Sequence, residues 1–345
     1  MLPMHVIVSM LAVRIPLWPS STPDHRRNAK GPERKLLRGA AAARPRRARR
    51  IRQTADVLTR HAAAPDLVLR YGPADEHVAD LRLTGARERA GDTPLAAKPL
   101  VIFLHGGFWR VAFDRAHTGP LAAALADEGF AVCTPEYRRT GQPGGGWPGT
   151  LDDIAAAVDL LPGLAAEAAG GMIDPGQTVL AGHSAGGHLA LWAAGRLRLP
   201  AGSPWRSGPP QAVGVVGLAA VCDLAACYEQ NLGDGAAAAL TGGSPADYPD
   251  RYASADPVAM LPAGVPARLV HGTADDRVPC QMSLDYVKQA RLAGDEADCE
   301  VLPGSGHFAM IDPPSAVWPR VVAAFGAMTT GAGRPGSRPA DPDRS

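Results

Sequence analysis

Cysteine is scarce in this sequence, and the few cysteines present are not arranged for a metal site or a disulfide framework. The 345 residues contain five. They lack the paired Cys-x-x-Cys spacing of a zinc site, and an odd number leaves at least one thiol unpaired. Because several lie in apolar runs, we expect reduced thiols and a cytoplasmic protein. The five are Cys133, Cys222, Cys227, Cys280 and Cys299.

An apolar run long enough to cross a membrane is absent from the N-terminal region. The apolar piece at 6–13 ends at Arg14, well short of the roughly 20 residues that a membrane-spanning helix needs. It could instead be the hydrophobic part of a signal peptide. However, no basic residue precedes it and no small-x-small cleavage site follows. We therefore expect neither membrane insertion nor export.

Net charge is nearly absent, at +1, but the charges are unevenly distributed. Residues 26–52 contain twelve Lys and Arg and a single Glu, so the remainder of the chain is acidic. This run could be an arm that binds nucleic acid or an anionic membrane, a solvated disordered tail, or sequence upstream of a true start near Val57. No nucleic-acid motif accompanies it. We therefore expect neither a nucleic-acid partner nor a membrane partner.

Apolar residues make up 46% of the chain, which is typical of a packed globular protein. We expect a disordered basic extension over 1–56, a folded domain over 57–328 whose first strand follows Asp66, and a disordered tail over 329–345. Within the domain, apolar strand-like runs alternate with helical segments. The expected strands are 67–71, 77–83, 100–104, 130–133, 178–181, 213–221, 267–270 and 298–302. The expected helices are 116–128, 151–160 with Thr150 as N-cap, 185–194, 281–292 and 316–328.

This alternation predicts an α/β fold, in which a mostly parallel central sheet is covered by helices on both faces. Residues 222–262 interrupt the alternation with a stretch rich in Gly, Ala and Asp that contains a helical piece near 235–240. We interpret this stretch as a small cap inserted at one end of the sheet.

A Gly-x-Ser-x-Gly sequence joins one expected strand to the next helix. It reads Gly182-His183-Ser184-Ala185-Gly186. Glycines at its two ends carry no Cβ, so a strand and a helix can approach closely around the serine. The Ser184 hydroxyl would then point out of the sheet. Alone, the pentapeptide also fits an ordinary turn between a strand and a helix.

Three further segments follow expected strands, where α/β sheets place their chemistry. These are His105-Gly106-Gly107-Phe108-Trp109, the run 271–279, and Gly304-Ser305-Gly306-His307-Phe308. Glycine-rich backbone can direct N–H groups at a developing oxyanion. A serine nucleophile needs a base such as histidine, and the histidine needs a carboxylate to hold its tautomer. The order along the chain is serine, aspartate, histidine.

Together these four motifs resemble the α/β-hydrolase fold, in the esterase/lipase group with a His-Gly-Gly oxyanion motif. Arylformamidase-like and prolyl oligopeptidase-like enzymes are neighbours of this group. The resemblance covers about 66–328. It implies that Ser184 is the nucleophile, His307 the base and Asp275 the acid, since Asp275 stands in an Asp-x-x-Val-Pro arrangement. The oxyanion donors would be the N–H groups of Gly107, Phe108 and Ala185. No metal or organic cofactor is implied.

One position departs from many esterases of this group, which read His-Gly-Gly-Gly. Phe108 stands at the last position here, as in the arylformamidase-like form, so the substrate class stays open. Asp276 is an alternative acid beside Asp275. Phe108, Trp109 and Tyr228 could line the pocket or belong to the core. We expect the other histidines near the motifs to brace loops or pack rather than catalyse, and Asp223 to hold the cap. These histidines are His105, His183, His188 and His271.

The expected activity is hydrolysis of a small carboxylic ester, or of a related acyl bond, through an acyl-serine intermediate. The substrate would be a small acyl compound. A formamide-cleaving or peptide-cleaving enzyme, an acyltransferase and a non-catalytic binding protein are the alternatives. The oligomeric state is not predicted. No long lid of bulky apolar residues is present in the sequence, which argues against a lipase that acts at an oil surface.

Overall fold

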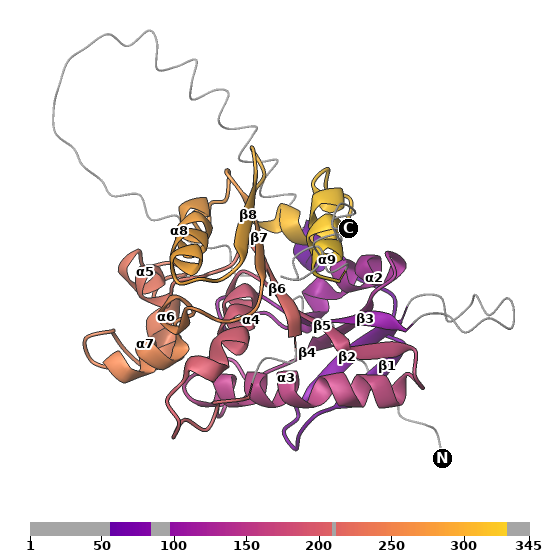
Figure 1. The fold of residues 1–345 in the computed structure, drawn as a ribbon, viewed down its shortest axis with the longest axis horizontal. Helices are drawn as coiled ribbons and strands as arrows, with labels where there is room; N and C mark the ends of the chain where they lie inside the picture. The colour runs from indigo at the N-terminus through magenta and orange to yellow at the C-terminus, as the bar shows by residue number, and fades with distance from the viewer. Residues whose placement is uncertain (1–55, 84–96, 209–211, 330–345) are drawn as a thin grey trace, which may run out of the picture. The chain divides into compact units, whose positions relative to one another are not determined.

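The structure is a computed structural model that describes residues 56–83, 97–208 and 212–329 (Figure 1). The predicted basic extension, apart from Asp56, lies outside the described residues, as does the predicted C-terminal tail beyond Thr329. Within the described ranges, eight strands form one sheet in the order β1-β2-β4-β3-β5-β6-β7-β8. The strands are β1 (Leu67–Arg70), β2 (Val78–Leu83), β3 (Lys98–Leu104), β4 (Ala131–Pro135), β5 (Ile173–His183), β6 (Ala212–Leu218), β7 (Ala267–Gly272) and β8 (Ala297–Leu302).

The sheet is mostly parallel, as predicted. The pairs β1–β2 and β2–β4 are antiparallel, while β3, β4, β5, β6, β7 and β8 pair with one another in parallel. Parallel strands end at the same edge of a sheet. The loops after β3, β5, β7 and β8 therefore meet at one edge, and these loops carry the four sequence motifs.

Side chains of the buried strands alternate between two hydrophobic layers. Leu100, Ile102 and Leu104 of β3 belong to one layer, and Val101 and Phe103 belong to the other. Both sets are fully buried, which explains why the strand reads as one continuous apolar run rather than as an alternating pattern. Burying a side chain of this size contributes roughly 1.5–3 kcal/mol. The two layers make the sheet a rigid support for the loops at its edge.

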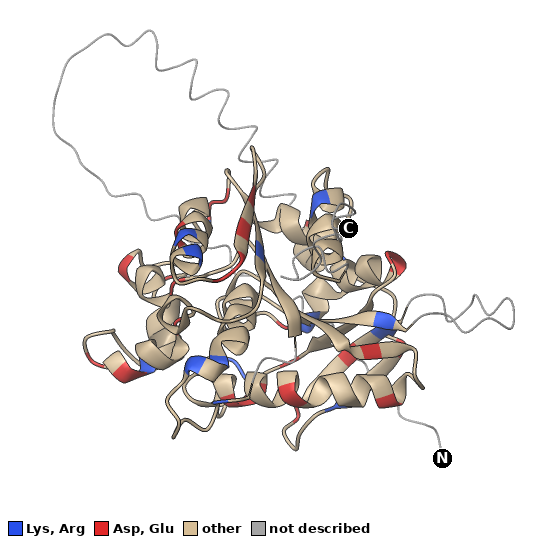
Figure 2. Ribbon diagram, viewed as in Figure 1, with Lys and Arg blue, Asp and Glu red and all other residues tan. Residues whose placement is uncertain are grey.

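Helices cover both faces of the sheet (Figure 1). Buried residues of α3, α4, α8 and the cap form the first layer, and those of α2 and α9 form the second. Strands β4 and β6 carry no charged residue, and Figure 2 shows many of the charged positions on helices and loops. Among the described residues outside the cap, the labelled helices are η1 (Arg115–Thr118), α2 (Gly119–Asp127), α3 (Gly149–Ala168), α4 (Ala185–Gly195), η2 (Arg196–Arg198), α8 (Cys280–Leu292), η4 (His307–Ile311) and α9 (Trp318–Thr329), and residues 56–59 are also helical.

Two helix predictions need correction. The expected helix 116–128 begins as the 3-10 turn η1, capped by Asp114, because Pro120 stands in the first turn of the α-helix that follows. Thr150 is not an N-cap. It lies inside α3, where its hydroxyl donates to the carbonyl of Arg138 (2.6 Å) and accepts from the N–H of Gly146 (3.0 Å). Thr150 therefore holds the preceding loop by hydrogen bonds instead of capping the start of the helix.

Helix α3 also runs further than expected, through Pro162 to Ala168. Proline inside a helix removes one backbone hydrogen bond and normally favours a break. Here Leu161, Pro162 and Ala165 are all buried. Packing of this apolar stripe against the sheet outweighs the lost bond, a tertiary effect that local sequence does not report.

The insertion forms three short helices and one 3-10 turn. They are α5 (Leu224–Glu229), α6 (Ala236–Thr241), α7 (Pro249–Ala255) and η3 (Val258–Met260). The strand before it ends at Leu218 rather than at the expected residue 221, because Ala219 has φ 46° and turns the chain out of the sheet. Asp223 caps α5 by accepting the N–H of Ala226 at 2.7 Å. This confirms the role expected for Asp223 in holding the cap.

Residues between the expected domain start at 57 and the first strand pack against the rest of the domain. Val57 is buried in the same apolar layer as Phe325, and Arg60 forms an ion pair with Asp312.

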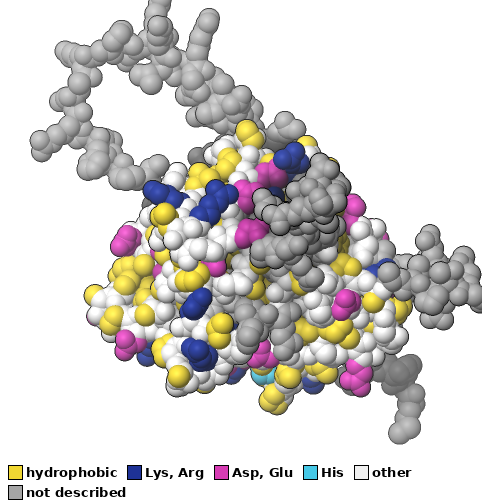
Figure 3. Space-filling view, in the orientation of Figure 1, with side chains coloured by type: hydrophobic (Ala, Val, Ile, Leu, Met, Phe, Trp, Pro, Cys, Tyr) yellow, Lys and Arg dark blue, Asp and Glu magenta, His cyan; other side chains and the backbone are white. Residues whose placement is uncertain are grey.

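Charged side chains of both signs are interspersed over the face seen in Figure 3. Within the described ranges, every helix is too short or too polar to cross a membrane.

Candidate active site

Ser184 is the single residue between β5 and α4, and its backbone is strained. Its dihedral angles are φ 57° and ψ −119°. A non-glycine residue in such a region costs on the order of 1–3 kcal/mol and persists only where its surroundings impose it. The backbone is held on both sides, because Ser184 N donates to Leu218 O (2.9 Å) and Val221 N donates to Ser184 O (3.1 Å). This is the sharp turn that the pentapeptide predicted.

The two glycines of the pentapeptide are required by close backbone contacts. A Cβ on Gly182 would overlap the carbonyl of Gly186, and a Cβ on Gly186 would overlap the carbonyl of Leu104 at the end of β3. Backbone atoms cannot move aside as a flexible side chain can. The turn at Ser184 therefore requires glycine at both ends.

His307 and Asp275 meet in a short hydrogen bond. His307 begins η4 after β8, and Asp275 follows β7. His307 Nδ1 lies 2.7 Å from Asp275 Oδ2. The other oxygen, Oδ1, accepts the N–H groups of Arg277 (2.8 Å) and Val278 (2.9 Å). The alternative acid, Asp276, instead has a side chain that is 60% exposed and pairs with Arg277.

The surroundings of Asp275 keep it ionised. Burial would raise the pKa of this carboxyl, but hydrogen bonds from His271, His307 and the N–H of Val278, with the attraction of His307, lower the pKa far below its usual range. An ionised carboxylate only accepts hydrogen bonds, so Nδ1 of His307 must carry the proton. Its Nε2 is then left with the lone pair that a general base needs.

His271 contacts Asp275 as well, which the sequence did not indicate. Its Nε2 lies 3.1 Å from Asp275 Oδ2 and 3.0 Å from the carbonyl of Val278. Both partners are acceptors, so Nε2 donates. Its Nδ1 lies 2.7 Å from the Ser283 hydroxyl on α8. His271 is thus structural, as expected. Its structural role is to donate a hydrogen bond directly to the carboxylate of Asp275, four residues further along the chain.

The loop that carries His307 lies beside the turn that carries Ser184. His183, the residue before the serine, donates from Nε2 to the carbonyl of His307 (3.1 Å), and the two rings lie 4.5 Å apart. Burial and the neighbouring His307 lower the pKa of His183 well below its usual value, so the ring is neutral at pH 7. His183 packs against the base, in line with its predicted role.

The loop after β3 passes directly over the serine turn. A Cβ on Gly106 would lie 3.2 Å from Ser184 Cβ and 2.8 Å from the carbonyl of His183. Gly107, Phe108 and Trp109 then have φ angles of 115°, 51° and 57°. Three successive positive φ angles curl this backbone sharply. The curl is closed by a hydrogen bond from Arg110 N to Gly107 O at 3.1 Å.

Backbone donors next to the serine are available to a ligand. The N–H of Gly107 has no hydrogen-bond acceptor among the described residues. Ala185 is the first residue of α4, and the first N–H groups of a helix lack intrahelical acceptors. These are two of the three groups that the sequence predicted as oxyanion donors, and Phe108 lies next to Gly107 in the same curl.

The three aromatic pocket candidates have different environments. Phe108 is 6% exposed, and its ring packs against Gly233 of the cap, where a Cβ would lie 2.6 Å from the ring. Trp109 is fully buried, 5.0 Å from the ring of His188, and is therefore core. Tyr228 is half-buried in the cap beside Tyr252. His188 donates from Nε2 to the carbonyl of Ala255 (2.9 Å) and so ties α4 to α7.

Comparison with known proteins agrees with this architecture. The BD-FAE family model matches residues 92–289, which is more than half of the chain. Esterase LipC of Mycobacterium tuberculosis is 26% identical over 235 residues, covering 65% of this chain and 56% of LipC. The chain thus spans little more than half the length of this relative.

Solved structures share the fold at low identity. A truncated carbohydrate esterase from gut microbiota has a TM-score of 0.63 at 22% identity, over 79% of this chain and 100% of that one. The native Est2 esterase of the planctomycete Thermogutta terrifontis has a TM-score of 0.61 at 19% identity, over 81% of this chain and 99% of that one. The chain therefore has the α/β-hydrolase fold and belongs to the BD-FAE family.

Proposed function

We propose that this chain is a serine hydrolase that cleaves a small carboxylic ester through an acyl-serine intermediate. The observation that carries the proposal is the 2.7 Å bond between His307 and an ionised Asp275, on a loop that packs against the strained turn of Ser184. A metal-independent acyl transfer needs a nucleophile, a base and an orienting acid. In this proposal those roles fall to Ser184, His307 and Asp275.

The reaction would proceed in two halves. Ser184 Oγ attacks the ester carbonyl carbon while Nε2 of His307 takes the hydroxyl proton, and the carbonyl electron pair moves onto oxygen. The N–H groups of Gly107, Phe108 and Ala185 stabilise this oxyanion. The tetrahedral species collapses, and the leaving alcohol takes the proton from His307. Water then attacks the acyl-serine with His307 again as base, which releases the acid and restores Ser184.

Named activities of relatives support an ester substrate with a small acyl group. LipC is named an esterase, and Est2 has been solved with propionate and with butyrate bound. Phe108 of this chain packs against Gly233 of the cap, so the cap lies in contact with the oxyanion loop. A formamide is the second candidate substrate, because Phe108 after His-Gly-Gly resembles the arylformamidase-like form of the motif.

Two further proposals concern the chain as a whole. We propose a cytoplasmic location, supported by the five free cysteines, of which Cys133, Cys222 and Cys227 are buried. We also propose that residues 57–328 form the catalytic unit and that 1–56 and 329–345 are dispensable for turnover. A truncated protein with these segments removed should keep the full-length kcat.

The proposal is tested by release of nitrophenol from short-chain nitrophenyl esters. We expect turnover by the wild-type protein and its loss in Ser184→Ala. The control is Ser254→Ala, since that hydroxyl donates to the carbonyl of Asp250 within the cap. Equal turnover in the wild type and Ser184→Ala would show that Ser184 is not the nucleophile. If the folded wild-type protein cleaves formanilides but no ester, the substrate is a formamide and the ester proposal is wrong.

A further inference from the structure

His105 opens the oxyanion loop, and both of its ring nitrogens face oxygens that accept hydrogen bonds. Nδ1 lies 2.8 Å from the carbonyl of Gly106, and Nε2 lies 2.9 Å from Oε1 of Glu136. A neutral imidazole has only one N–H. A neutral ring would therefore place a lone pair against one of these oxygens. The hydrogen-bond pattern is satisfied only by a doubly protonated, cationic ring.

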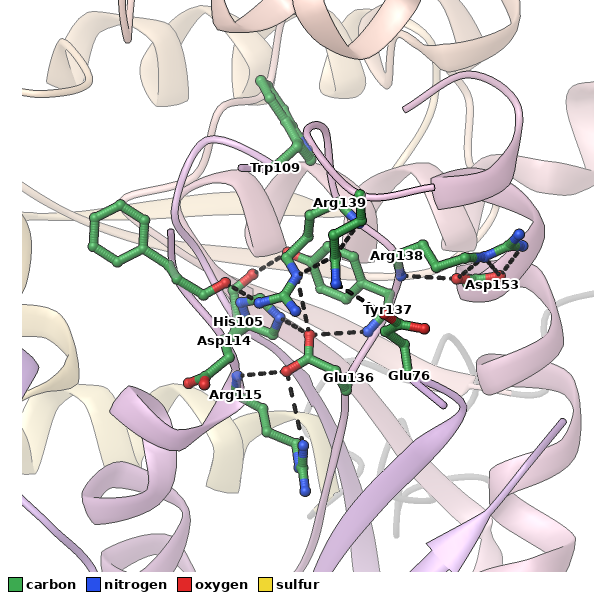
Figure 4. Close-up of polar contacts among 12 residues, drawn as sticks. Glu76, His105, Trp109, Asp114, Arg115, Glu136, Tyr137, Arg138, Arg139 and Asp153 are labelled. Carbon is green, nitrogen blue, oxygen red and sulfur yellow. Dashed lines mark hydrogen bonds and ion pairs between the residues drawn. The ribbon is translucent and has the colours of Figure 1, made fainter. Parts of the chain in front are cut away.

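Glu136 is built to hold that cation. It is 4% exposed and lies on the loop after β4. Figure 4 shows its carboxylate between the ring of His105 and the side chain of Arg115. It also accepts the N–H groups of Arg115 and Tyr137, each at 3.1 Å. Burial would raise the pKa of Glu136, but the attraction and hydrogen bond of His105, the attraction of Arg139 and the N–H of Arg115 lower it to about 2, so it stays ionised.

The ring itself cannot move away from this arrangement. His105 is fully buried and stacks on Tyr137, with ring centroids 4.3 Å apart and planes 14° apart. The Tyr137 hydroxyl donates to the carbonyl of His105 at 2.8 Å. Backbone and ring are thus held from the same neighbouring loop, and the direction of Nδ1–H is fixed.

The carbonyl that His105 holds belongs to the same peptide unit as the N–H of Gly107. In a trans peptide such as this one, C=O and N–H point to opposite sides. Drawing the Gly106 carbonyl toward Nδ1–H therefore turns the Gly107 N–H away from His105. Gly106 itself lies against Ser184, so this peptide plane is set within contact distance of the nucleophile.

We infer that His105 is a positioning residue for catalysis: as an imidazolium held by Glu136, it fixes the Gly106–Gly107 peptide so that the Gly107 N–H serves as an oxyanion donor. The inference rests on the proposed function. It adds a buried positive charge next to the site where negative charge develops in the transition state. Preorganised dipoles and charges of this kind act where water is excluded.

The protonation of His105 can be read without any substrate. In nitrogen-15 NMR of histidine-labelled protein at pH 8, we expect two protonated ring nitrogens for His105, assigned by loss of the signal in His105→Gln. His77 is a matched internal control. Its Nε2 lies 2.8 Å from Asp153 Oδ1, but its Nδ1 faces the N–H of Ala74 at 3.3 Å, so it should show one protonated nitrogen. A single protonated nitrogen on His105 would overturn the inference.

The catalytic consequence is tested by Glu136→Gln, which keeps the size of the side chain and removes its charge. The N–H of Tyr137 donates to Oε1, so the amide oxygen of the new side chain takes that position and Nε2 of His105 still donates to it. A neutral His105 then has no proton on Nδ1 to hold the Gly106 carbonyl, and the peptide would rotate. We expect kcat per folded protein to fall roughly tenfold, less than the 10²–10³ for loss of a whole oxyanion donor, with KM nearly unchanged. Affinity for a trifluoromethyl ketone, which forms a tetrahedral adduct with its own oxyanion, should fall by the same factor.

His77→Gln is the control variant, because it breaks a buried histidine–carboxylate pair that does not touch the oxyanion loop. It should leave kcat within twofold. An unchanged kcat in Glu136→Gln, a change confined to KM, or an equal loss in His77→Gln would each overturn the inference. A wild type that turns over no ester while His105 shows two protonated nitrogens would instead reject the proposed function and leave the charge of His105 established.

Discussion

Replacing Asp275 by asparagine changes one atom, and its effect on the site can be worked out from the hydrogen bonds. The N–H groups of Arg277 and Val278 both donate to Oδ1, so the amide oxygen of the new side chain must take that position. The amide nitrogen then occupies the place of Oδ2. There it meets Nδ1 of His307 and the N–H of His271.

A donor in that position forces His307 into the wrong tautomer. Nδ1 must then accept, so the proton moves to Nε2, and Nε2 no longer has the lone pair that takes the serine proton. The corresponding change in a well-studied serine protease lowers kcat about 10⁴-fold. We expect a fall of roughly 10³- to 10⁴-fold here, equivalent to about 4–5.5 kcal/mol of transition-state stabilisation. The clash of two N–H donors at His271 should also cost about 1–3 kcal/mol of stability.

The assay is kcat for a short-chain nitrophenyl ester, corrected for the folded fraction by circular dichroism. Asp276→Asn is the matched control, because the same change one residue later affects an exposed side chain. It should stay within about twofold of the wild type. A fall of less than tenfold in Asp275→Asn, or a comparable fall in Asp276→Asn, would refute the tautomer argument.

Two further predictions concern stability. Burial raises the pKa of Asp256 in the cap to about 6, above its value in the unfolded chain. The contribution of the protonated carboxyl to the free energy of unfolding is therefore full below about pH 4 and is lost as the pH rises through 6. Urea denaturation should show this loss between pH 4 and 6, and Asp256→Asn should abolish that pH dependence; an unchanged dependence in the variant would assign it to another group. Gly186→Ala should destabilise the protein by at least roughly 3 kcal/mol, because its Cβ meets the backbone of Leu104, whereas Gly163→Ala, whose Cβ meets nothing, should change stability by about 1 kcal/mol or less. Comparable denaturation midpoints in these two variants would contradict the steric argument at the serine turn.

The parallel core and the placement of the motifs could be predicted from the sequence because both depend on local patterns. The unbroken apolar run at 100–104 indicates a strand buried on both faces, and the glycines around Ser184 indicate a sharp turn. The end of α3 could not be predicted in this way. Local propensity favours a break at Pro162, and only burial of the neighbouring side chains against the sheet outweighs it.

The polar contacts around the site could be predicted from the sequence only in part, for a similar reason. Asp275 and Asp276 have the same side chain, so residue type does not distinguish them. The structure distinguishes them because the turn directs two backbone N–H groups at the carboxylate of Asp275. Glu136 meets His105 across 31 residues, between loops that the sheet brings together. A pattern of residue types along the chain does not report such a pairing, so the sequence predicted a bracing role for His105 without its partner.

The central claim is that Ser184, activated by His307, forms a covalent intermediate. Its most direct test is mass spectrometry of the protein after treatment with a reactive phosphonate ester, followed by peptide mapping. We expect one adduct per chain on Ser184, and labelling that is lost in Ser184→Ala and strongly slowed in His307→Ala. An adduct on another residue, or a folded wild-type protein that reacts no faster than Ser184→Ala, would contradict the claim.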